Sequence, residues 1–227
     1  MLSQTTLINK IIVIFHQSDA TPASTPMAHG AQLLPPDPCT PLDKGEQNRL
    51  DSLPYRSLVR SLMYVASGTR PDIAFAVSKL SCFLNCYRKT HWQAAVRVVR
   101  YLIGTRDLVL QLGGTSKVPI PMGYSDSDYA NDPGPQGRQS VGGYCFSLSS
   151  GMVSWSSKKQ KTVADLTCAA EYIAVSEARK ELIWLQALLT ELGYRLKGPS
   201  KLLCDNSTAV LLCADQAFHD RTKHLNV

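Results

Sequence analysis

The sequence predicts an α/β protein in which a small helical subdomain precedes a domain built on a mixed sheet. Two observations support this prediction. Apolar residues recur at helical spacing over 54–112, and from residue 119 onward short apolar strands alternate with turns and helical segments. With 227 residues the chain can form one large or two small domains, each with a core of its own.

Four segments are expected along the chain. Residues 1–27 hold a short apolar helix or strand, and 28–53 read as an exposed proline-rich linker without a core. Residues 54–117 form the helical subdomain, and 118–227 form the α/β domain.

In the helical subdomain, apolar spacing predicts one helix around 58–66 and a second that begins at Pro71 and continues to Leu84. A third helix is expected from about Thr90, as its N-cap, to Gly104. The stretch LVLQL at 108–112 predicts a short strand.

In the second domain, IPMGYSDSDYA predicts a strand, and GGYCFSLSSGMVSWSS predicts two strands joined at 149–151. A long helix is expected over about 165–192, closed by Gly193 at its C′ position. SKLLCDNS then predicts a strand and TAVLLCAD a helix. This order implies an antiparallel front half and a crossover to a parallel strand.

The composition excludes several classes of protein. The chain is 44% hydrophobic and 19% charged, as in ordinary soluble proteins. No apolar run approaches the roughly 20 residues of a membrane helix, and no signal peptide is recognisable, so we expect an intracellular protein that is not secreted. Seven scattered cysteines without a C-x-x-C pair indicate neither disulfides nor a zinc site.

The charge is unevenly distributed. Residues 54–113 carry nine Lys or Arg against two Asp, a net charge of +7, whereas the charges from residue 118 onward cancel. A basic module suggests a polyanion as partner, with Arg97 and Arg100 among the candidate contacts. A solvated basic helical surface explains the same charge equally well.

The stretch GYSDSDYAND at 123–132 contains three aspartates. It is not an EF-hand loop, because the positions that require an oxygen ligand, Gly and Glu hold other residues. Asp126 ends an apolar strand, and Asp132, ahead of Pro-Gly, is most simply a turn residue. If the strand continues, Asp128 lies on the same side as Asp126 and either assists the site or only lines it.

Two further carboxylates stand out. At 100° per residue, Glu171 falls on the apolar stripe of the long helix, whereas Glu177, Glu181 and Glu191 point away from it. Such a carboxylate requires a cation, unless it only complements the helix dipole. Asp205 ends another apolar strand, where ligands gather in α/β sheets or where an N-cap can lie. Together with Asp126, these residues form a candidate Mg²⁺ site.

The run SWSSKKQK places Lys158, Lys159 and Lys161 beside hydroxyl groups, which suits contacts to phosphate. A charged strand exit is the open alternative. Asn206, next to Asp205, completes the set of candidate nucleic-acid contacts.

Five motifs follow one another along the second half of the chain: GYSDSDYAND, SWSSKKQKTVA, AAEYIAVSEARKELIWLQALL, CDNSTAV and FHDRTKH. In this order they resemble the ribonuclease H domain of copia-type retrotransposon polyproteins. Upstream, PYRSLVRSLMYVASGTRPDIAFAVSKLS and HWQAAVRVVRYLIGT resemble the segment that connects this domain to the reverse transcriptase. SDATPASTPM is similar to the end of the polymerase region.

The resemblance implies a ribonuclease H fold with a five-stranded mixed sheet. It also implies two Mg²⁺ ions, replaceable by Mn²⁺, that are held by Asp126, Glu171 and Asp205 and cut the RNA strand of an RNA/DNA hybrid. The products would carry a 5′-phosphate and a 3′-hydroxyl. The expected partners are the hybrid and the upstream reverse transcriptase of the same polyprotein, with no membrane.

The sequence also departs from the family pattern. The Y-x-D-D motif of the polymerase is absent, Ala169 replaces the first glutamate of T-E-A-E-Y, and Asn226 stands where the family commonly has Asp. The family's last strand and helix, with a fourth metal-binding aspartate, would lie beyond Val227, so the fourth strand is expected to form an exposed edge. The alternative expectation is therefore a truncated, inactive remnant that at most binds nucleic acid.

Overall fold

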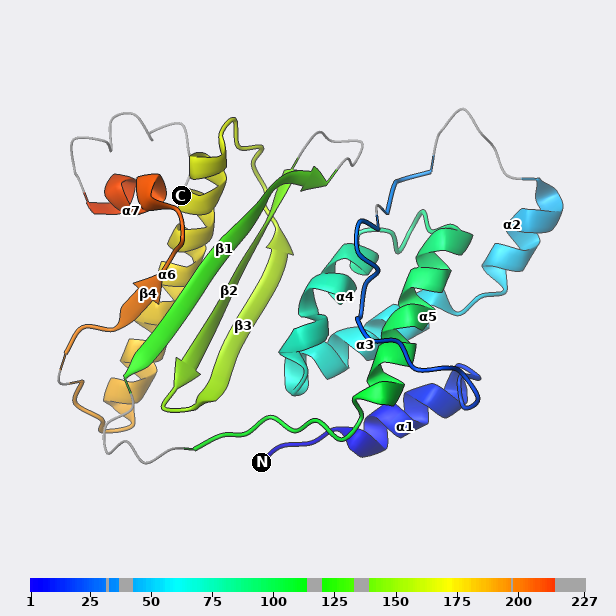
Figure 1. The fold of residues 1–227 in the computed structure, drawn as a ribbon, viewed down its shortest axis with the longest axis horizontal. Coiled ribbons are helices and arrows are strands. Elements are labelled where there is room, and N and C mark those ends of the chain that lie inside the picture. Colours follow the sequence, from blue (N-terminus) through cyan, green and yellow to red (C-terminus); the bar gives the residue numbers. More distant parts are fainter. Residues whose placement is uncertain (32, 37–42, 114–119, 133–138, 197, 215–227) are drawn as a thin grey trace. The chain divides into compact units, whose positions relative to one another are not determined.

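A computed structural model describes residues 1–227 except 32, 37–42, 114–119, 133–138, 197 and 215–227. The motif FHDRTKH and Asn226 therefore lie outside the described residues. The chain divides into two compact units, Met1–Leu110 (unit 1) and Gln111–Val227 (unit 2). Unit 1 is helical and unit 2 is a sheet with helices, so the chain has the α/β character that the sequence predicts (Figure 1).

The described part of unit 1 consists of helices of different lengths. They are α1 (Thr5–Ile14), α2 (Lys44–Asp51), α3 (Tyr55–Gly68), the 3₁₀ turn η1 (Pro71–Ile73), α4 (Ala74–Ser81) and α5 (Lys89–Gly104). Pro71 opens η1, where its missing N–H is tolerated, so the second predicted helix begins there as a 3₁₀ turn and ends earlier than expected.

One apolar core holds unit 1 together. It comprises buried residues of α1, α3, α4 and α5, among them Ile8, Leu58, Leu62, Leu80 and Leu102. The sequence prediction separated 1–27 from the helical subdomain, but α1 packs into the same core. The prediction missed this because ten residues of apolar sequence do not reveal what they pack against.

Three details of unit 1 differ from the sequence expectations. The expected linker 28–53 contains α2, whose Leu50 is buried. The expected strand LVLQL forms a single antiparallel bridge, between Leu110 and Leu2, and the unit ends at residue 110 rather than 117. Helix α5 is capped at Arg88, whose N–H donates to His91 Nδ1 at 2.9 Å, so Thr90 lies inside the helix.

The sheet of unit 2 has four described strands, in the order β3-β2-β1-β4. They are β1 (Pro121–Asp132), β2 (Gln139–Leu148), β3 (Gly151–Lys159) and β4 (Lys201–Leu203). The pairs β1–β2 and β2–β3 are antiparallel and β1–β4 is parallel, which confirms the predicted mixed sheet and crossover. Ser149, at φ 57°, lies in the hairpin turn between β2 and β3.

Helix α6 (Thr167–Glu191) covers one face of this sheet, and α7 (Ser207–Ala214) follows β4 (Figure 1). Gly193 has φ +85° and closes α6 as predicted. Its N–H donates to Thr190 O and that of Tyr194 to Leu189 O, the pattern of a Schellman motif. None of the described helices has the length and apolarity that a membrane span requires.

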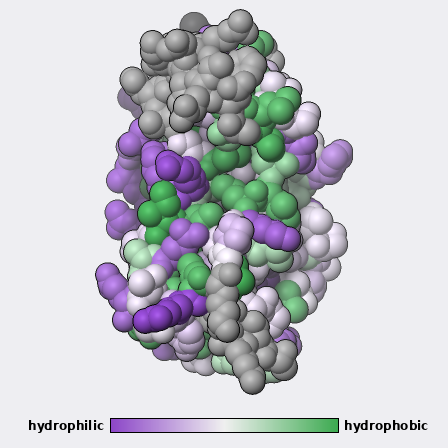
Figure 2. All heavy atoms as spheres, turned by 90° about the vertical axis from the view of Figure 1, so that its left-hand side faces the viewer, coloured by the Kyte–Doolittle hydropathy of each residue, from purple (hydrophilic) through white to green (hydrophobic). Residues whose placement is uncertain are grey.

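The β4 side of unit 2 carries exposed apolar side chains. Leu203 of β4 is 45% exposed, and Val210 and Leu211 of α7 are 47% and 63% exposed. Figure 2 views this side and shows apolar surface between hydrophilic residues. Among the described strands, β4 pairs with β1 alone and forms the expected edge.

Candidate metal centre

Three carboxylates come together where β1, α6 and the end of β4 meet. The N–H of Ser127 donates both to Asp126 Oδ1, at 2.8 Å, and to Glu171 Oε1, at 3.3 Å. Glu171 and Asp205, together with Cys204, offer ligand atoms that all lie within 4.8 Å of one another. The structure therefore places the three acidic residues singled out by the sequence in one cluster.

The position of Asp205 follows from the helix that comes after it. Helix α7 begins at Ser207, and the side chain of Asn206 accepts a hydrogen bond from the N–H of Ala209 at 2.9 Å. Asn206 is thus the N-cap of α7. Because the cap role is taken by Asn206, the carboxylate of Asp205 remains available to the cluster.

Glu171 is the buried member of the cluster. It is only 4% exposed, and it lies beyond the first turn of α6, where the helix dipole acts most strongly. Burial, followed by the negative charge of Asp126, raises the pKa of Glu171 to about 7, while the N–H of Ser127 opposes the shift. Asp205 adds to the increase.

No described cation neutralises this carboxylate. The ion pairs within the described ranges are Arg70–Asp72 and Lys180–Glu177, and neither touches Glu171. A buried carboxylate beside two others is stabilised in its charged form by a hard cation with oxygen ligands. The residues present therefore fit a Mg²⁺ or Mn²⁺ ion.

Cys204 is a member of this cluster that the sequence reasoning missed. Its Sγ donates to Glu171 Oε2 at 3.9 Å, and its pKa is raised, first by burial and further by the surrounding carboxylates. The neutral thiol is a donor to the carboxylate and a poor ligand for a hard cation. The only sequence signal was its position immediately before Asp205.

The other aspartates of β1 are not equivalent to Asp126. Asp128 is half-buried and pairs in register with Val141 of β2. Asp132 is the last residue of β1 and pairs with Gln139, so its assignment to a turn was wrong. The strand continues past a shift in register, which a sequence pattern of period two does not reveal.

Glu181 also differs from its expected orientation. It accepts hydrogen bonds from Ser154 Oγ at 2.6 Å and from the Tyr144 hydroxyl at 3.5 Å, so it points toward the sheet rather than away from it. The helical projection assumed that only apolar residues face the sheet. Here β2 and β3 present hydroxyl groups that can hold a carboxylate at the flank of α6.

The predicted basic contacts fall into two groups. Lys158, at the end of β3, and Lys161, just after it, are exposed, and Lys159 lies between them. In unit 1, Arg97 donates to Thr25 Oγ1 at 3.0 Å and Arg100 to Thr21 O at 2.6 Å. These two guanidinium groups hold a segment of their own unit in place.

The buried Arg70 accounts for a further part of the basic charge. It is 2% exposed and makes two hydrogen bonds to Asp72 through Nε, one through Nη2, and others to Thr105. Its charge is therefore neutralised by Asp72 inside unit 1. The net charge of +7 over residues 54–113 already includes this pair, so it comes from the other basic side chains.

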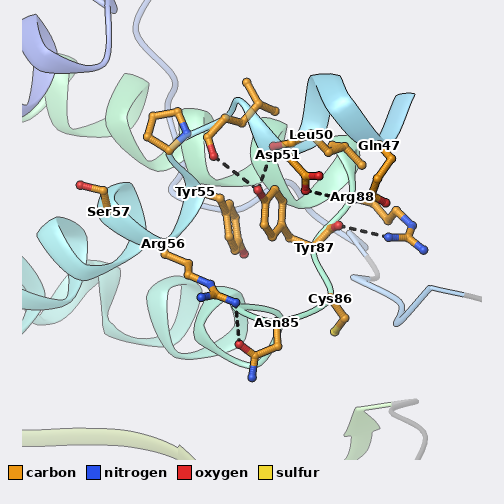
Figure 3. Close-up of a pocket in the computed structure, with 12 residues that line it drawn as sticks. Gln47, Leu50, Asp51, Tyr55, Arg56, Ser57, Asn85, Cys86, Tyr87 and Arg88 are labelled. Atoms are coloured by element: carbon orange, nitrogen blue, oxygen red, sulfur yellow. Dashed lines mark hydrogen bonds between the residues drawn. The ribbon is translucent and has the colours of Figure 1, made fainter. Parts of the chain in front are cut away.

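Unit 1 also has a polar cavity of about 490 Å³ between α2, the start of α3 and residues 85–88. Figure 3 shows the stacked rings of Tyr55 and Tyr87, with centroids 4.5 Å apart. Arg56 donates to Leu84 O and Asn85 Oδ1 and belongs to the wall of the cavity. The cavity holds no cluster of carboxylates.

In comparisons with known proteins, the chain is similar over its full length to polyproteins of plant transposons. The chain is 43% identical over 226 residues to the retrovirus-related Pol polyprotein from transposon TNT 1-94 of Nicotiana tabacum, covering 100% of this chain and 16% of the relative. It is 40% identical over 228 residues to the corresponding polyprotein from transposon RE1 of Arabidopsis thaliana, covering 100% of this chain and 15% of the relative.

A shorter relative is the secreted RxLR effector protein 161 of Plasmopara viticola. It is 46% identical over 138 residues, which are 60% of this chain and 94% of the relative. No protein-family model matches the chain. No solved structure matches it either.

Proposed function

The chain belongs to the family of retrovirus-related Pol polyproteins of copia-type transposons, and we propose that the segment it represents is a retroelement ribonuclease H. It spans 16% and 15% of the length of the two polyproteins described above. The proposed reaction is the metal-dependent, endonucleolytic hydrolysis of the RNA strand of RNA/DNA hybrids.

The carboxylate cluster is the observation that carries this proposal. Asp126 of β1 shares the Ser127 N–H with Glu171 of α6, and ligand atoms of Glu171 and Asp205, just after β4, lie within 4.8 Å of one another. The buried Glu171 has a raised pKa and no described counter-cation. They would hold two Mg²⁺ ions, which when bound activate a water molecule and stabilise the leaving oxygen. The Ser127 N–H fixes one oxygen each of Asp126 and Glu171, so the pair is oriented before any cation binds.

The fold is compatible with the proposal. The described part of unit 2 is an open mixed sheet covered by α6. Asp126 lies within β1, Asp205 just after β4, and Glu171 on the helix that packs against the sheet. We assign this unit to the ribonuclease H-like fold and the helices of residues 54–110 to the segment that connects it with an upstream reverse transcriptase.

The substrate would be held through its phosphates. Exposed Lys158 and Lys161 lie in the same unit as the cluster and suit this role, together with Lys159. Arg97 and Arg100 are weaker candidates, because each already donates to its own unit.

The test is a cleavage assay with the purified chain. A labelled RNA/DNA hybrid is incubated with Mg²⁺ or Mn²⁺, beside RNA duplex and DNA duplex of the same sequence. We expect cleavage of the RNA strand of the hybrid alone, reduced to background in Asp126→Asn and in Glu171→Gln. Glu177→Gln is the matched control, since Glu177 lies exposed on the same helix and pairs with Lys180.

Two outcomes would contradict the proposal. Hybrid cleavage that is no higher in the wild type than in Asp126→Asn would exclude the nuclease activity. Salt-sensitive binding of the hybrid without cleavage would instead identify a remnant that only binds nucleic acid.

A further inference from the structure

Gln160 is a buried polar residue that connects three elements of unit 2. It follows β3 directly and is only 7% exposed. Its backbone N–H donates to Ser140 O of β2 at 2.8 Å. Its side-chain Nε2 donates to Ser127 Oγ of β1 at 3.2 Å and to Ala170 O of α6 at 2.9 Å.

The chemistry of the partners fixes the orientation of this amide. The carbonyl oxygen of Ala170 can only accept a hydrogen bond, so the atom that faces it must be the amide nitrogen. A carboxylate or a thioether at this position could not replace that donor. The contact therefore requires a hydrogen-bond donor at this position as well as a side chain of suitable size.

Both partners of this amide are neighbours of the carboxylates. Ser127 follows Asp126 on β1, and Ala170 precedes Glu171 on α6. The N–H of Ser127 in turn donates to both carboxylates. We propose that Gln160 is a positioning residue that sets the spacing between Asp126 and Glu171 and so the affinity of the site for divalent cations; this inference rests on the proposed function.

The space for the amide depends on a glycine. A Cβ on Gly142, the register partner of Ser127 on β2, would lie 3.2 Å from Gln160 Nε2 and 3.5 Å from Ala174 Cβ. Gly142 and Gln160 also line a cavity of about 80 Å³ between β2, β3 and α6. A methyl group at this position would push the amide away from its partners without removing any of its atoms.

The test uses one isosteric variant and one displacing variant. Gln160→Met keeps the volume but removes the donor, and Gly142→Ala keeps the donor but displaces it. Gln186→Met is the matched control, because Gln186 donates to Ser200 Oγ at 3.0 Å elsewhere on α6. For each chain, Mn²⁺ binding is titrated by calorimetry, hydrogen exchange is followed over the first turns of α6 without metal, and hybrid cleavage is measured against Mg²⁺ concentration.

We expect Gln160→Met and Gly142→Ala to weaken Mn²⁺ binding by roughly 10- to 100-fold, as loss of an outer partner does at other metal sites. The start of α6 should exchange faster, and saturating Mg²⁺ should restore most of the cleavage. Restoration by metal separates a positioning role from a general loss of structure. Gln186→Met should match the wild type in all three measurements.

The outcomes distinguish the inference from the proposed function. If the wild type binds Mn²⁺ and cleaves the hybrid while Gln160→Met folds and is indistinguishable from it, the role of Gln160 is overturned alone. If Gln160→Met does not fold, Gly142→Ala decides by the same criterion. A wild-type chain that neither binds Mn²⁺ nor cleaves would overturn both proposals.

Discussion

The two units bury different kinds of residue. Unit 1 has one continuous apolar core that runs through α1, α3, α4 and α5. In the described part of unit 2, buried apolar residues form two small clusters of three residues, around Phe146 and around Ala170, and others such as Val141 and Leu189 lie outside both. Buried polar residues accompany them: Ser125, Ser127, Ser140, Gln160 and Glu171.

This difference indicates which unit carries the candidate metal site. Burial of apolar surface stabilises unit 1, whose described buried polar residues are Thr69, His91 and Arg70, the last paired with Asp72. Unit 2 keeps a buried carboxylate with a raised pKa, which lowers its stability until a proton or a cation arrives. Stability and the candidate site are thus concentrated in different units.

The largest expected effect is a core truncation in unit 1. Leu62 is fully buried in the centre of the core, so Leu62→Ala should lower the free energy of unfolding of this unit by about 2–5 kcal/mol. Hydrogen exchange of α3, read by mass spectrometry, measures the change. The neighbouring Met63→Ala is the control, because Met63 is 43% exposed and should change stability by less than about 0.5 kcal/mol. Equal effects of the two substitutions would refute the single-core description.

The next effect concerns the buried carboxylate of unit 2. Because the pKa of Glu171 rises from 4.5 when unfolded to about 7 when folded, the folded chain binds the proton more tightly. In metal-free solution its contribution is fully present below pH 4.5 and is lost as the pH rises through 7. Glu171→Gln should therefore raise the stability of unit 2 at pH 8 by up to about 3 kcal/mol.

Thermal or denaturant unfolding in the presence of a chelator, from pH 4 to pH 8, checks this prediction. Mg²⁺ at about 100 times its dissociation constant should stabilise the wild type by about 2.7 kcal/mol at pH 8 and should leave Glu171→Gln unchanged. Parallel pH profiles for the two chains would show that Glu171 is not the titrating group.

A smaller effect tests the close packing between β1 and β2 beside the Phe146 ring, which also belongs to the cluster with Ala178 and Leu185 of α6. A Cβ on Gly123 would lie within 3 Å of three ring atoms of the buried Phe146. Gly123→Ala should therefore destabilise unit 2 by about 1–3 kcal/mol through overpacking. Gly198→Ala is the matched control, because no atom lies within 4 Å of its added Cβ. An unaltered melting curve for Gly123→Ala would mean that this part of the core is loosely packed.

The sequence predicted the cluster because each of its acidic residues has a local signature. Asp205 follows an apolar strand, and Glu171 interrupts an apolar helical stripe. Asp126 was expected at the end of an apolar strand, but it lies within β1, which continues to Asp132. Properties that depend on distant parts of the chain were not predictable in this way. Three features rest on contacts between separate elements. They are the packing of α1 in the core of unit 1, the hydroxyl groups that bind Glu181, and the hydrogen bond from Gln160 to α6.

The position of Asn206 is compatible with two roles, a contact to nucleic acid and the N-cap of a helix. Its position beside Asp205 suggested a contact to nucleic acid, whereas in the structure its side chain caps α7 through Ala209. If capping is its role, Asn206→Ala should destabilise unit 2 by about 0.5–2 kcal/mol, and Asn206→Asp should retain nearly all of the stability. Denaturant unfolding measures both substitutions.

Hybrid binding of the same two variants separates the two roles. A cap acts on α7 and on the neighbouring Asp205, so Asn206→Asp should bind the hybrid and hold the metal nearly as well as the wild type. A direct contact to phosphate would instead make Asn206→Asp the worse variant, because a new negative charge would face the backbone of the hybrid. The order of the two variants in binding, compared with their order in stability, therefore decides whether Asn206 serves the fold of unit 2 or its substrate.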